Sequence, residues 1–229
     1  MSGPQVIVLA KAPVPGRVKT RLCPPCTPAQ AALVAAAALA DTLDVVAASR
    51  AGRRILAVDG AFEAPPGWEV MPQRGESLGA RLAHAFADSD RPGTATVLVG
   101  MDTPQLSARD LDETFRRLAA PHGPGAVLGP AADGGWWALG LRDSRHASVL
   151  AGIATSTART GADTWEALRR RGLRVAALRR LTDVDTADDA RAVAALCPVA
   201  SRFPAAVAAH VPAGSHAPAA VPAGRGSGR

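Results

Sequence analysis

Residues 6–21 are Val6-Ile7-Val8-Leu9-Ala10-Lys11-Ala12-Pro13-Val14-Pro15-Gly16-Arg17-Val18-Lys19-Thr20-Arg21. The first four are an apolar, strand-like run, and the remainder is a basic stretch bent by proline and glycine. Its two lysines are the only lysines among the 26 basic residues of the chain. A basic loop at the end of a strand is suited to hold phosphate groups. The stretch therefore predicts the first strand of a sheet followed by a phosphate site, with a solvated basic loop as the alternative.

Apolar β-branched runs alternate with alanine- and leucine-rich windows along the chain, a pattern that predicts an α/β fold. Strands are expected over residues 6–10, 54–58, 69–71, 95–100, 125–128, 136–141 and 174–178. Cap residues place the helices between them. Helices are expected over residues 28–48 after Thr27, from Ser107 to about 119, from Asp163 to Gly172, and over residues 187–196 after Thr186.

The composition predicts one domain over residues 1–200 and a disordered tail over residues 201–229. The tail has no Asp or Glu and few large apolar side chains. Its three arginines supply half of the formal charge of +6, so the body is only mildly basic. No lysine run with interleaved aromatic residues is present, so no nucleic-acid partner is expected. The oligomeric state is left open.

Several other classes lack support in the sequence. We find no signal peptide, and the apolar run over residues 31–40 is too short to cross a bilayer, so a cytoplasmic protein with no membrane partner is expected. Cys23 and Cys26 have no second pair and no nearby histidine, so we interpret them as incidental. No Ser/His/Asp arrangement, P-loop or dinucleotide-binding glycine motif appears.

Asp102 directly follows the strand expected over residues 95–100. In an open α/β sheet ligands bind beyond the carboxyl ends of the strands. A carboxylate at such a strand end is well placed to bind a divalent cation that bridges phosphates. The alternative is an aspartate that only caps a turn.

The segment Asp133-Gly134-Gly135-Trp136-Trp137 holds half of the four tryptophans. Two glycines after an acid permit a close backbone approach or a positive φ. Neighbouring side chains on a strand face opposite sides, so at most one indole can face a ligand while the other packs in the core. The segment predicts a wall for a sugar or another polar ring, with a hairpin carrying two core aromatics as the alternative.

Two further stretches are weaker candidates. Asp183 and Asp185 lie on the same side of an extended segment, and one of them could complete a cation site begun by Asp102. Residues 73–81 follow a short strand and lead into a helix. In this stretch Gln73, beside a glycine, could contact a nucleobase edge, and Arg81 could reach phosphate.

Taken together and in this order, these stretches resemble the small bacterial GT-A-like transferases of the DUF2064 type, also called rSAM/selenodomain-associated transferase 1. The resemblance covers residues 5–197. It implies a GT-A-like, Rossmann-like single domain with a central, mostly parallel mixed sheet flanked by helices. It also implies a nucleotide or nucleotide-sugar substrate, a small-molecule acceptor, and Mg²⁺ or Mn²⁺ as cofactor.

The candidate site residues follow from the stretches and the resemblance together. Nucleotide binding is assigned to Ala10, Lys11, Gly16, Arg17, Lys19, Arg21, Gln73, Gly75 and Arg81. The acceptor is assigned to Asp133, Gly134, Gly135, Trp136 and Trp137, the cation to Asp102 and Asp185, and catalysis to Asp133, Lys19 and Asp102. Met101 and the two tryptophans depart from the family pattern, which more often has a small residue and tyrosines, so the acceptor's identity is not carried over.

Two reactions fit these assignments. A glycosyltransferase would move a sugar from a nucleotide-diphosphate-sugar to the acceptor, with Asp133 as general base. A nucleotidyltransferase would join an NTP to a phosphorylated or acidic acceptor and release pyrophosphate. Four basic side chains in one loop favour the second reaction, whereas the family description and the tryptophans favour the first, which we place ahead. A non-catalytic nucleotide-binding module is the third interpretation.

Overall fold

The computed structural model describes residues 3–213. A single sheet forms its centre, with strand order β3-β2-β1-β4-β6-β5-β7. Only β6 runs antiparallel to its neighbours, so the mostly parallel mixed sheet is confirmed. The strands are β1 (Gln5–Lys11), β2 (Arg53–Asp59), β3 (Glu69–Pro72), β4 (Thr96–Gly100), β5 (Ala126–Pro130), β6 (Trp136–Leu141) and β7 (Val175–Ala177).

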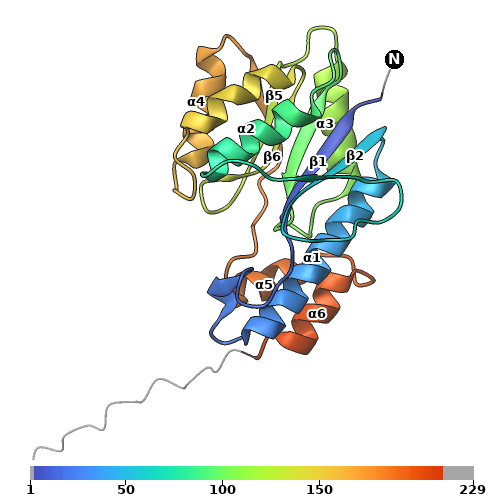
Figure 1. Ribbon diagram of the computed structural model, residues 1–229, viewed down its shortest axis with the longest axis vertical. Helices are drawn as coiled ribbons and strands as arrows, with labels where there is room; N and C mark the ends of the chain where they lie inside the picture. Colours follow the sequence, from blue (N-terminus) through green and yellow to red (C-terminus); the bar gives the residue numbers. More distant parts are fainter. Residues whose placement is uncertain (1–2, 214–229) are drawn as a thin grey trace, which may run out of the picture.

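The helices flank this sheet (Figure 1). They are η1 (Thr20–Leu22), α1 (Pro28–Ala48), α2 (Leu78–Ser89), α3 (Ala108–Ala119), η2 (Ser144–Gly152), α4 (Thr160–Arg170), α5 (Ala187–Ala194) and α6 (Arg202–His210). The expected caps are present, because Thr27 and Ser107 each accept a hydrogen bond from the backbone of the third helical residue and complete a capping box. Thr186 forms a third capping box, in which Asp189 is the partner acid.

Alternating strand residues build a separate core on each face of the sheet. On one face, Val6 and Val8 of β1 pack with α1 and α3. On the other face, Ile7 packs with α2, η2 and α4. Because both faces of the sheet are covered by helices, most side chains of the central strands β1 and β4 are buried, which explains why these strands are largely apolar.

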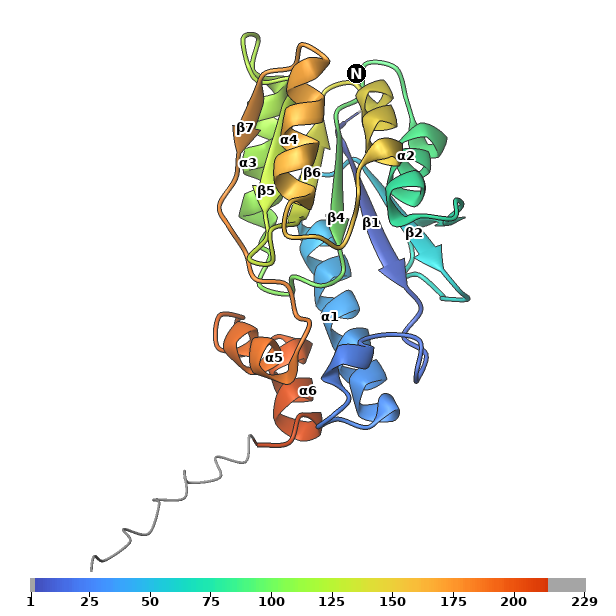
Figure 2. The ribbon, with the colours of Figure 1, turned by 90° about the vertical axis from the view of Figure 1, so that its left-hand side faces the viewer.

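Helix α1 is buried on two sides. Its Leu39 and Leu43 face the sheet, while Ala31, Val34 and Ala38 face α5 and α6. The two views agree that α5 and α6 lie beside α1, beyond one end of the sheet (Figures 1 and 2). By length and hydropathy alone α1 could span a membrane, but most of its apolar window is covered by the rest of the molecule. Its uniformly apolar composition is explained by these two packing partners.

The predicted boundary at residue 200 is wrong. Residues 202–210 form α6, whose Phe203 is fully buried and whose Val207 is nearly so. The buried carboxylate of Asp41, on α1, accepts hydrogen bonds from the backbone N–H groups of Arg202 and Phe203, at 3.0 and 2.8 Å. Asp41 thereby satisfies two free donors of the α6 N-terminus. The domain extends at least to residue 213, and the rest of the expected tail lies outside the described residues.

All three cysteines are free thiols, and they lie near one another in the core formed by α1, α5 and α6. Burial raises the pKa of the Cys197 thiol to about 11. Burial also raises the pKa of Cys26. At Cys26 and Cys197 a raised pKa disfavours the thiolate that metal binding and redox chemistry require.

Candidate functional site

A cavity of about 630 Å³ opens at the carboxyl ends of β1 and β4. These strands are neighbours in the sheet, with Leu9 paired to Gly100. Strand β1 lies between β2 and β4, so the chain's strand order reverses there, which is where open α/β sheets bind ligands. All predicted site residues line this cavity except Gly16, Gly75 and Gly134, which shape the backbone beside it.

Lys19 occupies the centre of the charged part of the cavity. Its side chain is only 7% exposed, and its ammonium lies 2.5 Å from a carboxylate oxygen of Asp102 and 3.9 Å from Asp185. The ammonium also donates to the carbonyl oxygen of Val184. Lys19 has a left-handed backbone (φ 50°, ψ 41°), which is unusual for a residue other than glycine. Lys19, which the sequence predicts to bind phosphate, is thus paired in this structure with Asp102 and Asp185, which the sequence predicts to bind a metal ion.

The other cations of the basic loop divide into two groups. The Arg21 guanidinium forms an ion pair with Asp185 at 2.7 Å. Lys11 and Arg17 are exposed and form no ion pair within residues 3–213. The loop therefore offers two unpaired cations to a ligand, beside two cations that are already shared with carboxylates.

Two hydrogen bonds to backbone carbonyls join the turn after β4, which carries Asp102, to the segment that carries Asp183 and Asp185. The N–H of Val184 donates to the carbonyl oxygen of Asp102 at 2.9 Å, and the Gln105 side chain donates to the carbonyl of Thr182 at 2.6 Å. Burial raises the pKa of the Asp183 carboxyl, and the nearby carboxylates of Asp133 and Asp185 raise it further. This concentration of negative charge favours a cation at this side of the cavity.

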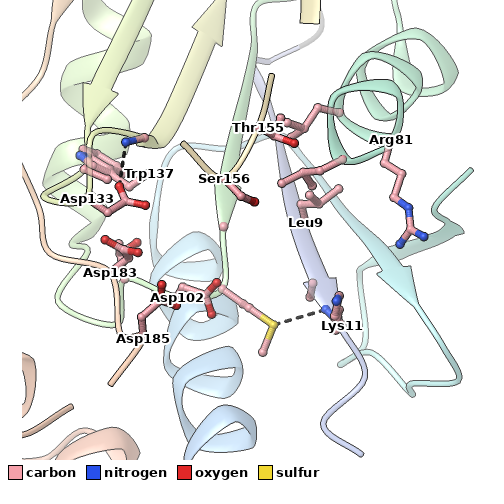
Figure 3. Close-up of a pocket in the computed structure, with 18 of the residues that line it drawn as sticks. Leu9, Lys11, Arg81, Asp102, Asp133, Trp137, Thr155, Ser156, Asp183 and Asp185 are labelled. Carbon is pink, nitrogen blue, oxygen red and sulfur yellow. Dashed lines mark hydrogen bonds between the residues drawn. The ribbon is translucent and has the colours of Figure 1, made fainter. Parts of the chain in front are cut away.

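The residues fit a divalent cation only with help from a substrate. Within the described residues, no three histidine, cysteine or acidic side chains are arranged to hold a metal ion. The carboxylates of Asp102 and Asp185 nevertheless supply the hard oxygen ligands that Mg²⁺ and Mn²⁺ prefer, and Mg²⁺ is commonly held by one or two carboxylates plus substrate phosphates. Figure 3 shows these acids grouped on one side of the cavity, with Lys11 and Arg81 on the other.

Met101, which departs from the family pattern, has a structural role beside this site. Its sulfur accepts the backbone N–H of Lys11 at 3.3 Å (Figure 3), and the side chain is buried. The thioether therefore ties the end of β1 to the turn that carries Asp102.

The turn at Asp133-Gly134-Gly135 packs closely against the start of α4. One carboxylate oxygen of Asp133 accepts the N–H of Gly135 at 2.7 Å. Gly134 has φ +90°, and a Cβ there would lie 2.2 Å from the carbonyl oxygen of Ala158. Gly161 donates its N–H to the Gly134 carbonyl at 2.8 Å. Gly134 thus has both expected properties, a positive φ and a close backbone approach.

Replacing Gly134 with alanine should lower the free energy of unfolding by about 3 kcal/mol or more, because a strained backbone and a collision add. Gly67 is the matched control, since it has φ +83° and open space around its Cβ position. Gly67→Ala should cost only the strain, about 1 kcal/mol. Chemical denaturation measures both values, and equal losses would contradict the close approach at Gly134.

The two tryptophans lie on opposite faces of β6, as strand alternation predicts. Trp137 is 3% exposed and donates its indole N–H to the carbonyl of Arg179 at 3.0 Å. Its ring lies flat on β5, where a Cβ at Gly129 would come within 2.4 Å. Trp136 is half-buried on the opposite face of β6. Trp136 is therefore the more exposed of the two indoles.

Gln73 and Arg81 brace the loop that joins β3 to α2. The Gln73 amide nitrogen donates to the carbonyls of Ala10 and Ala57, at 2.7 and 3.0 Å. Arg81 forms an ion pair with Asp59 at 3.0 Å and donates to the carbonyl of Gly75 at 3.1 Å. Both side chains line the cavity, but much of their hydrogen-bonding capacity is already used by the protein.

The structure places further residues on the cavity lining that the sequence did not assign to a site, among them Glu76, Thr155 and Ser156. Ser156 has φ +60°, and within residues 3–213 it and Lys19 are the only non-glycine residues with positive φ. Such backbone strain gathers at functional sites. The hydroxyl-rich run from Thr155 to Thr157 was the available signal, but only the fold brings Thr155 and Ser156 to the cavity that Leu9 also lines (Figure 3).

Several solved structures with the same fold are described as transferases or synthetases. A protein from Desulfovibrio desulfuricans G20, provisionally described as a nucleotide-diphospho-sugar transferase, matches with a TM-score of 0.79 and 27% identity over 91% of this chain and 98% of its own. CMP:2-keto-3-deoxy-manno-octonic acid synthetase in complex with CTP matches with a TM-score of 0.53 and 12% identity, over 85% and 98%. The manganese complex of Rv0371C from Mycobacterium tuberculosis H37Rv matches with a TM-score of 0.52 and 23% identity, over 83% and 98%. These likenesses confirm the expected GT-A-like transferase fold.

No curated protein matches this chain. The model of the family described as "Uncharacterized protein conserved in bacteria (DUF2064)" matches residues 32–157, which is more than half of the chain. The matched segment includes the Asp102 turn, the Asp133 turn, Trp136 and Trp137. This is the family that the sequence pattern resembles, and the chain belongs to it.

Proposed function

We propose that this protein is a metal-dependent glycosyltransferase that moves a sugar from a nucleotide-diphosphate-sugar to a small-molecule acceptor in the cytoplasm. The observation that carries the proposal is the arrangement of one cavity. Lys19 and the acids Asp102 and Asp185 line the same cavity as Lys11 and Arg17, which form no ion pair within the described residues, and the Asp133–Trp136 wall borders that cavity. The likeness to a protein provisionally described as a nucleotide-diphospho-sugar transferase supports the same conclusion.

The charge balance of the cavity favours a diphosphate over a triphosphate. Five cationic and five acidic side chains line it: Lys11, Arg17, Lys19, Arg21 and Arg81, and Glu76, Asp102, Asp133, Asp183 and Asp185. One divalent cation offsets the charge of an NDP-sugar, whereas a triphosphate leaves negative charge that this balanced cavity does not neutralise. Two of the four loop cations, Lys19 and Arg21, already have carboxylate partners.

Each residue has a role in this reaction. Asp102 and Asp185 would hold Mg²⁺ or Mn²⁺, which when bound neutralises the departing nucleoside diphosphate. Lys11, Arg17 and Lys19 would bind the phosphate oxygens and stabilise charge that develops there. One Asp133 oxygen is oriented by the Gly135 N–H, so its carboxylate can accept the proton of an acceptor hydroxyl.

The reaction is tested by separating its products. The purified protein is incubated with UDP-, GDP- and ADP-sugars, and separately with NTPs, each with a metabolite extract and Mn²⁺, and products are followed by mass spectrometry. We expect release of a nucleoside diphosphate from a sugar donor. Release of pyrophosphate without a nucleoside diphosphate would favour nucleotidyl transfer, for which the four basic residues of the loop argue.

A metal-dependent enzyme differs from a passive nucleotide-binding module in its response to Asp102→Asn. For the enzyme, this change should weaken nucleotide affinity in the presence of Mn²⁺, because it removes a charged cation ligand. Titration calorimetry with and without Mn²⁺ measures the effect. Unchanged affinity would support the non-catalytic module.

A further inference from the structure

Resting on the proposed function, we propose that the loop between β3 and α2 selects the base of the donor, and that Gln73 and Glu76 together favour guanine. Both residues line the cavity and follow the carboxyl end of β3, which lies at the edge of the sheet and four strands from β6, where Trp136 begins the strand. The phosphate-binding residues Lys11 and Lys19 line the same cavity. If Lys11 and Lys19 bind the diphosphate of the donor and the transferred sugar lies toward Trp136, the base lies at the opposite end of the cavity, beside the β3–α2 loop.

The orientation of the Gln73 amide is fixed by the sheet. Two backbone carbonyls, those of Ala10 and Ala57, lie at 2.7 and 3.0 Å from its nitrogen. A carbonyl can only accept, so the amide nitrogen must face both, and both of its N–H groups are used. The amide oxygen accepts no hydrogen bond within residues 3–213. Gln73 can therefore offer a ligand an acceptor and no donor.

Glu76 adds a second acceptor. Its carboxylate lines the cavity and forms no ion pair or hydrogen bond within the described residues. Arg81 contributes the opposite character, since its Nε and one terminal nitrogen are engaged by Gly75 and Asp59 while the other terminal nitrogen is not. The β3–α2 loop and the first turns of α2 thus contribute two acceptors and one guanidinium to the lining of the cavity.

Contacts at both ends of this loop hold its backbone in place. The Gln73 N–H donates to the carbonyl of Val58 at 3.1 Å, and Ser77 caps α2 by accepting the N–H of Ala80 at 3.1 Å. Gly75 has φ +121° and packs directly on Ala80. A preorganised set of polar groups discriminates better than a mobile one, because a mismatched base leaves them unpaired.

Guanine matches this set better than the other bases. Its Watson–Crick edge has two adjacent donors, N1–H and N2–H, beside the O6 acceptor, which suits two acceptors and a guanidinium. Adenine and cytosine each present one amino group. Uracil presents one donor between two carbonyl oxygens, which the Glu76 carboxylate repels. We therefore expect GDP to bind most tightly and UDP most weakly.

The test compares GDP, ADP, CDP and UDP by titration calorimetry in the presence of Mn²⁺. These ligands share their phosphates, so differences report the base. GDP should bind at least about tenfold more tightly than UDP, the size of one good bidentate contact. Glu76→Gln should reduce this ratio to about threefold or less, because its amide can also donate to uracil. Glu166→Gln is the matched control, since Glu166 lies outside the cavity and pairs with Arg170, and should leave the ratio unchanged.

The outcomes separate this inference from the proposed function. If the four nucleotides bind and any base other than guanine is preferred, or if Glu76→Gln leaves the ratio unchanged, base selection by this loop is overturned while nucleotide binding stands. If none of the four binds, the proposed function and this inference both fail.

Discussion

Lys19→Met should lower the rate of transfer by about 10² to 10³, the loss typical of removing one charged stabilising group from a water-poor site. The ammonium is almost fully buried and contacts both Asp102 and Asp185. Methionine keeps the length and the apolar stem but not the charge. Methionine also bears the same left-handed backbone at a cost similar to that of lysine, so the change isolates the charge.

The same variant has a second signature in the absence of nucleotide. Without the ammonium, Asp102 and Asp185 lose a competing cation, so Mn²⁺ alone should bind more tightly to Lys19→Met than to the unchanged protein. Nucleotide affinity should fall in parallel. Titration calorimetry with Mn²⁺ alone, and then with nucleotide, measures both effects.

Arg170→Met is the control for Lys19. Arg170 lies at the exposed end of α4, and within residues 3–213 it pairs only with Glu166. It should leave the rate, the Mn²⁺ affinity and the nucleotide affinity unchanged. Equal effects of the two variants would refute the phosphate-binding role of Lys19.

Phe203→Ala should lower the free energy of unfolding by about 3–5 kcal/mol, the cost of emptying a large, fully enclosed aromatic site. Phe203 is 0% exposed and packs in the core between α1, α5 and α6. The midpoint of thermal unfolding should fall by about 10 °C for a domain of this size. Calorimetry or denaturant unfolding provides the measurement.

Val199 provides the comparison, since it precedes α6 and is 97% exposed. Val199→Ala should change stability by no more than about 0.5 kcal/mol. A Phe203→Ala variant as stable as Val199→Ala would mean that α6 does not belong to the folded domain. Removal of all residues after Ala200 should be as damaging as Phe203→Ala, because it removes the same side chain with the rest of α6.

Local signals explain why much of the fold was predictable. Helix α1 has its expected bounds because Thr27 and Pro28 cap and start it, and β6 has its expected bounds because glycines precede it. Helix α6 was missed because its sequence is rich in alanine and its partner is the second face of α1, which is distant in sequence. The spacing of Phe203, Val207 and Val211 is helical, but three apolar residues show little without the surface that covers them.

The sequence was enough to predict several residues that line the cavity, but not the contacts that these residues make with one another. Polar residues at strand ends identified Lys11, Asp102 and Asp133 because parallel strands bring their carboxyl ends to one edge. No local pattern shows that Lys19 adopts a left-handed backbone and reaches Asp102. Nor could the sequence show that Gln73 uses both of its N–H groups on neighbouring strands. These contacts depend on the register of strands far apart in the chain.

Val184 connects its own segment to two distant parts of the chain through its backbone N–H and carbonyl groups. Its N–H binds Asp102 and its carbonyl accepts from Lys19, which is 165 residues away. During synthesis on the ribosome, Lys19 and Asp102 emerge long before Val184 does. The cavity is therefore completed only when the last quarter of the polypeptide has been made and docked, so a partly synthesised chain has the basic loop after β1 but not the finished cavity.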